Sequence, residues 1–327
     1  MASFRQRAGK WQARVSIKGF PTETRSFNTK ADAQHWAREL ESAMTRGVYK
    51  NLADAEELLF RDVMQRYLTE VTPTKRSAKR ETEGIQFMQR SKMASYSMAK
   101  LTPATIAEYR DQRLKTVSAG TIIREICILS SMINHARREW GLAIDNPCAL
   151  VRKPASPIGR NRLLKADEEA RLLEELKPRK RRSPWMVPLV TLALETAMRR
   201  GELLSLRWEH IDLATQTALL PLTKNGTSRV VPLSRKAVAV LAELSRSDYG
   251  PVFPISHMTM HNCFTDACKR AGIKNLHFHD LRHTATSRLA EKLPNVIELA
   301  AVTGHQTIQM LKRYYHPKAE TLAQKLG

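Results

Sequence analysis

Helical periodicity between residues 57 and 146 is the feature that most restricts how this 327-residue chain can fold. From about residue 120 to 140, apolar side chains recur every three or four positions, and basic side chains largely occupy the opposite face. We therefore predict a bundle of about four to five helices with one basic face, and a merely solvated charged surface is the alternative. The inward positions of the 120–140 helix are Ile122, Ile126, Leu129, Met132, Ile133 and Ala136, and its outward basic positions are Arg124, His135, Arg137 and Arg138.

A large excess of positive charge indicates a polyanionic partner. The chain has 54 Lys and Arg against 32 Asp and Glu, a formal net charge of +22. Neutralising phosphates releases condensed counterions, so such a chain is expected to bind nucleic acid, either DNA or, as a ribosomal-type protein does, RNA. The sequence predicts no secretory signal and no transmembrane helix, because it contains neither an apolar leader nor about 18 uninterrupted apolar residues.

The four scattered cysteines fit a reducing cytoplasm. His257, His261, Cys263 and Cys268 crowd into twelve residues, which raises the possibility of a zinc site. No C-x-x-C pair accompanies them, so we expect no metal and instead one helix whose sulfurs fill the core.

The first 50 residues have a pattern typical of a small sheet backed by one helix. Residues 11–18 alternate apolar and polar side chains, a turn follows at 19–21, and a second, antiparallel strand is predicted over 22–27. Thr29 precedes a helix that runs to about Met44. The polar face of this module suits a DNA groove, although the module could serve stability alone.

Beyond a proline-rich, basic linker candidate at 152–157, the pattern mixes helices with short strands. Two strands are predicted over 218–222 and 229–233, and the Asn225-Gly226 pair between them is a strong hairpin signal. A helix over 189–208 is interrupted near residue 197. The sequence therefore predicts a mostly α fold with small β elements (α+β): a sheet-plus-helix module, a helical bundle and a mixed α/β domain.

Six residues between positions 199 and 314 have side chains suited to holding and attacking a phosphodiester. Two guanidiniums, one ammonium and two imidazoles would surround one phenol, and this set can stabilise a pentacoordinate phosphate without a metal or another cofactor. Taken singly, each residue has an ordinary explanation as a solvated charge or a core aromatic. The six are Arg199, Lys224, His279, Arg282, His305 and Tyr314.

Local sequence suggests how these side chains are presented. The hairpin would carry Lys224 at its tip, and the i, i+3 spacing of His279 and Arg282 places both on one face of a helix. Gly304 permits a tight turn before His305. From spacing alone, either tyrosine of the pair 314–315 could face the site.

Four segments within roughly residues 185–316 resemble the tyrosine recombinase (phage integrase) family: TAMRRGE, LTKNGTSRVVPL, HFHDLRH and TGHQTIQMLKRYYH. The resemblance assigns the nucleophile to Tyr314, with Tyr315-His316 matching the family's Tyr-x-His ending. Two positions depart from the family pattern, since Ala197 stands where glycine is usual and Thr303 where leucine is usual. The family's other catalytic side chains map onto Arg199, Lys224, His279, Arg282 and His305.

This resemblance implies a mechanism of DNA strand exchange. Tyr314 would attack a scissile phosphate and form a 3′-phosphotyrosyl enzyme with a free 5′-hydroxyl. Arg199 and Arg282 would hold the non-bridging oxygens, and Lys224 would protonate the leaving oxygen. Whether His279 or His305 accepts the phenolic proton stays open.

The resemblance also implies the domain roles and the partners. Residues 1–50 would be an arm-type DNA-binding module, 57–150 a helical core-binding (SAM-like) domain and 158–327 the catalytic integrase domain. The partners would be double-stranded DNA recombination sites, and a homotetramer would bind two such sites. The protein would be cytoplasmic and associated with the bacterial nucleoid, with no membrane partner.

Several alternatives stay open at this stage. The residues of these motifs also resemble those of shufflon-type DNA invertases. The choice between integration, excision and inversion is undetermined, and so is the involvement of accessory DNA-bending or directionality factors. A type IB topoisomerase-like enzyme and a non-catalytic DNA-binding regulator are the alternative functions.

Overall fold

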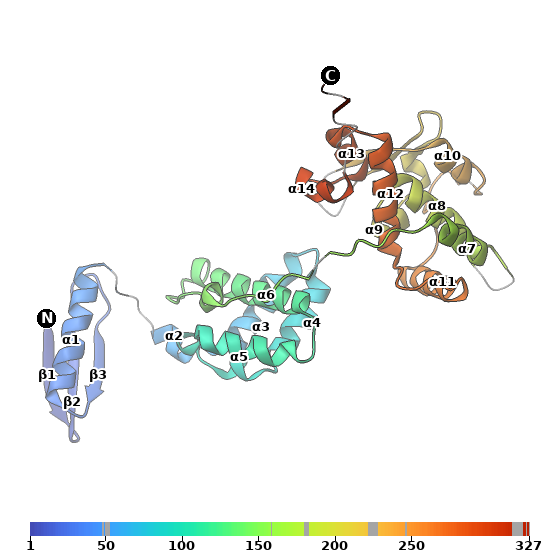
Figure 1. Cartoon of the computed structure of the whole chain (residues 1–327). Helices are drawn as coiled ribbons and strands as arrows, with labels where there is room; N and C mark the ends of the chain where they lie inside the picture. Colours follow the sequence, from blue (N-terminus) through green and yellow to red (C-terminus); the bar gives the residue numbers. More distant parts are fainter. Residues whose placement is uncertain are drawn as a thin grey trace. The chain divides into compact units, whose positions relative to one another are not determined.

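The chain is mostly helical with small antiparallel sheets, which confirms the predicted fold class (Figure 1). It forms two compact units, Met1–Ile158 and Gly159–Gly327. No helix in the described ranges combines the length and apolarity needed to cross a bilayer. The computed structural model describes residues 1–47, 49, 53–157, 159–179, 183–221, 228–245, 247–315, 323–324 and 326.

The N-terminal part of the first unit is a three-stranded antiparallel sheet with a helix across one face (Figure 1). Ala13 and Val15 point toward the helix and are fully buried, because alternate residues of a strand face the same side. Thr29 caps the helix by accepting a hydrogen bond from the Asp32 amide. The predicted strands and helix are confirmed, and a further strand precedes them. The elements are β1 (Ala2–Arg7), β2 (Lys10–Val15), β3 (Glu23–Phe27) and α1 (Lys30–Thr45).

A bundle of helices with its own apolar core completes the first unit. All six predicted inward positions of its longest helix are buried, and Arg124, Arg137 and Arg138 are exposed as predicted. The prediction for His135 was wrong: its ring is half-buried between Tyr67 and Trp140, with centroid distances of 5.6 and 5.1 Å. The helices are α2 (Ala53–Glu57), α3 (Phe60–Glu70), α4 (Ala78–Met88), α5 (Pro103–Leu114) and α6 (Ala119–Arg138).

The second unit packs most of its helices around the apolar helix α8 (Met186–Thr196). Strands β4 (Ile211–Asp212), β5 (Thr217–Leu220) and β6 (Arg229–Pro232) form an antiparallel sheet in that order. This confirms the two predicted strands, and the hairpin tip that carries Lys224 lies outside the described residues. The other helices are α7 (Ala166–Leu176), α9 (Arg200–Leu204), α10 (Arg235–Ala242), α11 (His257–Arg270), α12 (Phe278–Lys292), α13 (Val296–Thr303) and α14 (Ile308–Leu311).

Helix α11 carries the crowded histidines and cysteines of the sequence. Cys268 is buried in the core of the second unit, and Cys263 packs against that core. Within the described ranges, no group of three or more His, Cys, Asp or Glu side chains is placed to hold a metal ion.

Candidate active site

The junction between α8 and α9 positions Arg199. Helix α8 ends at Thr196 because Ala197 adopts a left-handed backbone, with φ at 50°. This conformation costs a non-glycine residue roughly 1–2 kcal/mol, so the alanine found where glycine is usual carries backbone strain. Met198 is buried, and Arg199 has an extended backbone and immediately precedes α9 (Arg200–Leu204). The helix predicted over 189–208 is thus interrupted near residue 197, as expected.

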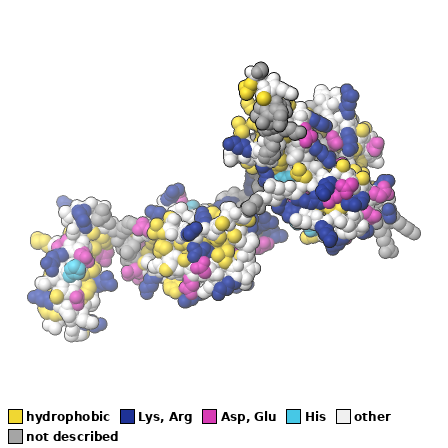
Figure 2. Space-filling model, viewed as in Figure 1, with side chains coloured by type: hydrophobic (Ala, Val, Ile, Leu, Met, Phe, Trp, Pro, Cys, Tyr) yellow, Lys and Arg dark blue, Asp and Glu magenta, His cyan; other side chains and the backbone are white. Residues whose placement is uncertain are grey.

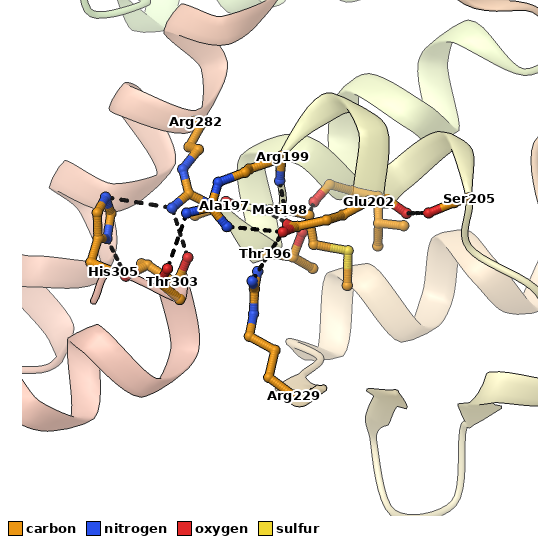
Figure 3. A network of polar contacts seen from close by, with 12 residues as sticks. Thr196, Ala197, Met198, Arg199, Glu202, Ser205, Arg229, Arg282, Thr303 and His305 are labelled. Carbon is orange, nitrogen blue, oxygen red and sulfur yellow. Dashed lines mark hydrogen bonds and ion pairs between the residues drawn. The ribbon is translucent and has the colours of Figure 1, made fainter. Parts of the chain in front are cut away.

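Glu202 joins two arginines from different elements (Figure 3). Its carboxylate accepts from Arg199 Nη1 at 2.9 Å and from the Arg199 backbone amide at 2.7 Å. Both terminal nitrogens of Arg229, the first residue of β6, also donate to it, at 3.1 and 2.9 Å. Burial alone would raise the pKa of Glu202, but the hydrogen bonds from Arg229 and Arg199 outweigh it and lower that pKa. The carboxylate is therefore ionised at neutral pH.

Arg282 projects from α12 into the same network and is only 5% exposed. It donates to the carbonyl of Ala197 through Nη1 and to that of Thr303 through Nη2, the latter at 2.7 Å. Burial, followed by the nearby charge of Arg199, lowers the pKa of Arg282 to about 10, so it remains a cation at neutral pH. The negative charge of an anion bound between the two guanidiniums would oppose both effects by favouring the charged form.

A single tautomer of His305 satisfies its two ring contacts. Thr303 Oγ1 donates to the carbonyl of Leu299 at 2.6 Å and lies 2.6 Å from His305 Nδ1. A hydroxyl has one proton, so Oγ1 must accept from Nδ1–H. The other nitrogen, Nε2, lies 3.4 Å from Arg282 Nη2, which can only donate. Both contacts therefore require a proton on Nδ1 and a lone pair on Nε2 (Figure 3).

The phenol of Tyr314 lies beside the histidines. Its hydroxyl is hydrogen-bonded to Nδ1 of His283, and the two rings are stacked with centroids 5.7 Å apart. The ring of His305 is 6.0 Å from that of Tyr314. His279, one turn before His283 on α12, contacts the His283 ring edge-to-face at 5.2 Å. Tyr314 also packs against the small apolar cluster formed by α12, α13 and α14, which holds its ring in place.

The structure thus brings together five of the six predicted residues, and the sixth, Lys224, lies outside the described residues. Four neighbours were not among the predicted site residues: Glu202, Arg229, His283 and Thr303. Two of them had a signal in the sequence: His283 directly follows Arg282 in the motif HFHDLRH, and Thr303 departs from the family pattern.

The network is matched to a phosphodiester in charge and in donors. Arg199, Arg229 and Arg282 with Glu202 leave two positive charges. A guanidinium has five N–H donors. Arg282 uses three on protein acceptors and Arg199 uses two, so each retains donors for phosphate oxygens. Phosphate oxygens gain negative charge as phosphorus becomes pentacoordinate, and fixed cations stabilise that charge.

Comparison with known proteins identifies the family of this chain. A sequence model of the phage integrase family matches residues 162–321. The shufflon-specific DNA recombinase of Escherichia coli is 42% identical over 272 residues, which span 80% of this chain and 70% of that protein. The chain belongs to the phage integrase family. This tyrosine recombinase is an enzyme of site-specific DNA recombination, and the predicted family is confirmed.

Further relatives agree with the assignment. Tyrosine recombinase XerC of Xanthomonas campestris is 30% identical over 249 residues, covering 71% of this chain and 73% of that protein. Among solved structures, the Tn1549 transposon integrase in complex with circular intermediate DNA has a TM-score of 0.67 at 17% identity, covering 83% of this chain and 100% of that one. A lambda integrase tetramer bound to a Holliday junction has a TM-score of 0.66 at 19% identity, covering 94% and 93%. These relatives favour recombination over the topoisomerase-like and regulatory alternatives.

Removing the Thr303 hydroxyl should leave Nδ1 of His305 without its hydrogen-bond partner. A neutral hydrogen bond contributes about 1 kcal/mol, so we expect Thr303→Val to slow DNA strand cleavage about five- to tenfold. Thr303→Ser keeps the hydroxyl and should retain the rate. In protein labelled with ¹⁵N-histidine, the chemical shifts of His305 should show the Nδ1–H tautomer for threonine and serine only. A valine variant with unchanged shifts and rate would contradict this role.

Proposed function

We propose that this recombinase cuts and rejoins double-stranded DNA at specific sites through a 3′-phosphotyrosyl intermediate formed on Tyr314. The observation that carries the proposal is the cluster itself: the phenol lies within 6.0 Å of His305, whose ring contacts the buried guanidinium of Arg282. A nucleophile at this position would lie next to cationic side chains that can orient a phosphodiester.

The proposed roles follow from charge and donor geometry. Arg199 and Arg282 would bind the two non-bridging oxygens of the scissile phosphate with forked donors. Glu202 would hold Arg199 and Arg229 in position without contacting DNA. Lys224 would protonate the leaving 5′-oxygen, His279 would contact a phosphoryl oxygen, and His305 would hold Arg282 in position through Nε2. The phosphotyrosine conserves the energy of the broken bond, so resealing needs no nucleotide cofactor.

The first unit would supply DNA binding. On the sheet face opposite α1, Arg5 lies beside Gln12, and Arg14 lies between Ser3 and Thr24. This exposed polar and basic face suits a DNA groove, which supports an arm-type role for residues 1–50. Residues 57–150, with exposed Arg124, Arg137 and Arg138 on α6, would bind the core recombination site, and 158–327 would catalyse strand exchange. Lys and Arg side chains are spread over the visible face of each part, with acidic side chains among them (Figure 2).

Exchange of strands between two duplexes needs four active sites, so we propose a homotetramer on two DNA sites in the bacterial cytoplasm, with accessory DNA-bending or directionality factors as candidate further partners. The 42% identity to a shufflon-specific recombinase supports inversion of DNA segments as the outcome. A plasmid carrying two inverted copies of the native site would test this, because inversion changes its restriction pattern whereas integration requires a second molecule.

Incubation with a nicked suicide duplex carrying the native site tests the chemistry. Cleavage next to the nick releases a short fragment that carries the free 5′-hydroxyl, and its diffusion away prevents rejoining. The protein should therefore accumulate as a covalent DNA adduct, seen on a denaturing gel. Tyr314→Phe should abolish the adduct, whereas Tyr315→Phe, the matched control, should retain it. An adduct that persists without the Tyr314 hydroxyl would overturn the proposal.

A further inference from the structure

The described histidines of the site differ in what they offer to the nucleophile. His305 has both ring nitrogens committed, Nδ1 to Thr303 and Nε2 to Arg282. His279 lies against the His283 ring rather than against the phenol. Among the histidines that the structure describes, only His283 is hydrogen-bonded to the Tyr314 hydroxyl, through Nδ1. The ring that touches the reacting oxygen is therefore neither of the two histidines that the family pattern selects.

We propose that His283 is a catalytic residue, the base that accepts the phenolic proton of Tyr314. This inference rests on the proposed function. In the cleavage step, the proton passes from the Tyr314 hydroxyl to His283 Nδ1 as the phenolic oxygen forms a bond to phosphorus. The bond from phosphorus to the 5′-oxygen breaks, and that oxygen takes its proton from a separate acid. During rejoining, the 5′-oxygen forms a bond to phosphorus and gives its proton back to the separate acid, and the imidazolium returns its proton to the phenolate as the tyrosine departs.

The protonation states fit this direction of transfer. Burial raises the pKa of Tyr314, although Arg313 and Arg282 oppose the effect, so the phenol carries its proton before the reaction. Burial, His279 and Arg313 lower the pKa of His283 to about 4, so its ring is neutral and free to accept. In the neutral tautomer with its proton on Nε2, Nδ1 accepts the hydrogen bond that the hydroxyl donates.

Binding of DNA would strengthen His283 as a base. The charged and titratable groups around it are His279, Asp280 and Arg282 on α12, Arg313 and Tyr314 in the following turn, and His305 after α13. The positive members of this set hold the His283 pKa down. A phosphodiester seated on Arg199 and Arg282 adds negative charge nearby, which raises the pKa of an imidazole toward neutrality. A base whose pKa lies near the working pH is the most effective.

A different role would use the same hydrogen bond. His283 could hold the tyrosine as a latch in the DNA-free protein and release it on binding. A latch slows the reaction, so its removal would leave cleavage unchanged or faster. A base speeds the reaction, so its removal would slow cleavage in a way that depends on pH and on the acidity of the phenol. The two roles therefore predict opposite results.

The test uses the full chain and the nicked suicide duplex. His283→Asn places an amide near Nδ1 that cannot take a proton. We expect its cleavage rate near pH 7 to fall about 10²–10⁴-fold, the usual contribution of a general base, and to rise steadily with pH. Incorporating a fluorinated tyrosine at position 314, whose phenol is more acidic, should restore much of the rate of His283→Asn. His279→Asn and His305→Asn are the matched controls, and the fluorinated tyrosine should not restore theirs.

The outcomes separate this inference from the proposed function. If the unsubstituted protein forms no adduct with Tyr314, the proposed function fails. If it does form one and His283→Asn cleaves as fast or faster, or is not restored by the more acidic phenol, His283 is not the base. Thermal unfolding and gel-shift binding of each variant exclude a folding defect. If His283→Asn does not fold, His283→Gln provides the same comparison. If neither folds, the pH dependence of the cleavage rate of the unsubstituted protein decides. The apparent pKa on the acid side of this profile should belong to His283 and should not change when the phenol of Tyr314 is made more acidic. A change in this apparent pKa would overturn the proposal.

Discussion

Replacing Glu202 with leucine should destabilise the second unit by about 3–5 kcal/mol, because it leaves two partly buried guanidiniums without their shared, buried counter-ion. Glu202 is 6% exposed and accepts hydrogen bonds from both Arg199 and Arg229. Chemical denaturation followed by circular dichroism would measure the loss. Strand cleavage should be lost with it even where the variant stays folded, since the backbone amide and side chain of Arg199 are both anchored on this carboxylate.

Asp167→Asn is the matched control for Glu202→Leu. Asp167 pairs with Arg171 on the exposed surface of α7 at 3.4 Å, and a solvated pair of this kind contributes little to stability. We expect a change of no more than about 0.5 kcal/mol there. Similar losses for the two variants would show that the buried carboxylate does not hold the network together.

The stabilising effect of Glu202 should also depend on pH. Its folded-state pKa is lowered by Arg229 and Arg199 against the opposing effect of burial. A carboxyl group whose pKa is depressed on folding stabilises the protein above its unfolded pKa, about 4.3 for glutamate. That contribution disappears as the pH falls through the folded value. The difference in unfolding free energy between the protein and Glu202→Leu should therefore be full at pH 7 and shrink below about pH 4.

Local pattern was enough to predict most of the elements. The 3.6-residue period of the 120–140 segment gave α6 and its buried face, because the side of a helix that packs is encoded within a few turns. Alternation and the Asn225-Gly226 signal gave the paired strands β5 and β6. His135 was placed wrongly because a basic ring at an outward position looks solvated until Tyr67 and Trp140, from elsewhere in the chain, cover it.

The supporting network of the site could not be predicted in the same way. Arg229 and Glu202 are 27 positions apart, and only the tertiary fold brings them together. Thr303 was noted only as a departure from the family pattern. Its contact with His305 depends on the left-handed backbone of Gly304, which turns the chain so that the His305 imidazole meets the last residue of α13. Motif spacing identifies the side chains that do chemistry, whereas the residues that orient them follow from tertiary geometry.

Gly304→Ala should abolish detectable strand cleavage and lower the unfolding free energy by about 2–5 kcal/mol, the sum of backbone strain and overpacking. Gly304 ends α13 with φ at 68°, a conformation that an L-residue adopts only under strain. A Cβ at this position would also lie 2.6 Å from Cζ of Arg229 and closer still to its Nη1. Arg229 would have to leave Glu202, and the Gly304 carbonyl that accepts from Arg199 at 3.1 Å would move.

Gly272→Ala separates the two contributions. Gly272 has φ at 67°, almost the same backbone conformation, but a Cβ there meets nothing within 4 Å. It should therefore show only the strain of roughly 1–2 kcal/mol and keep full cleavage activity. Combining Gly304→Ala with Arg229→Ala removes the colliding group, and a double-mutant cycle should recover part of the lost stability. Equal losses at Gly272 and Gly304, with no coupling to Arg229, would show that glycine is needed at 304 for its backbone alone.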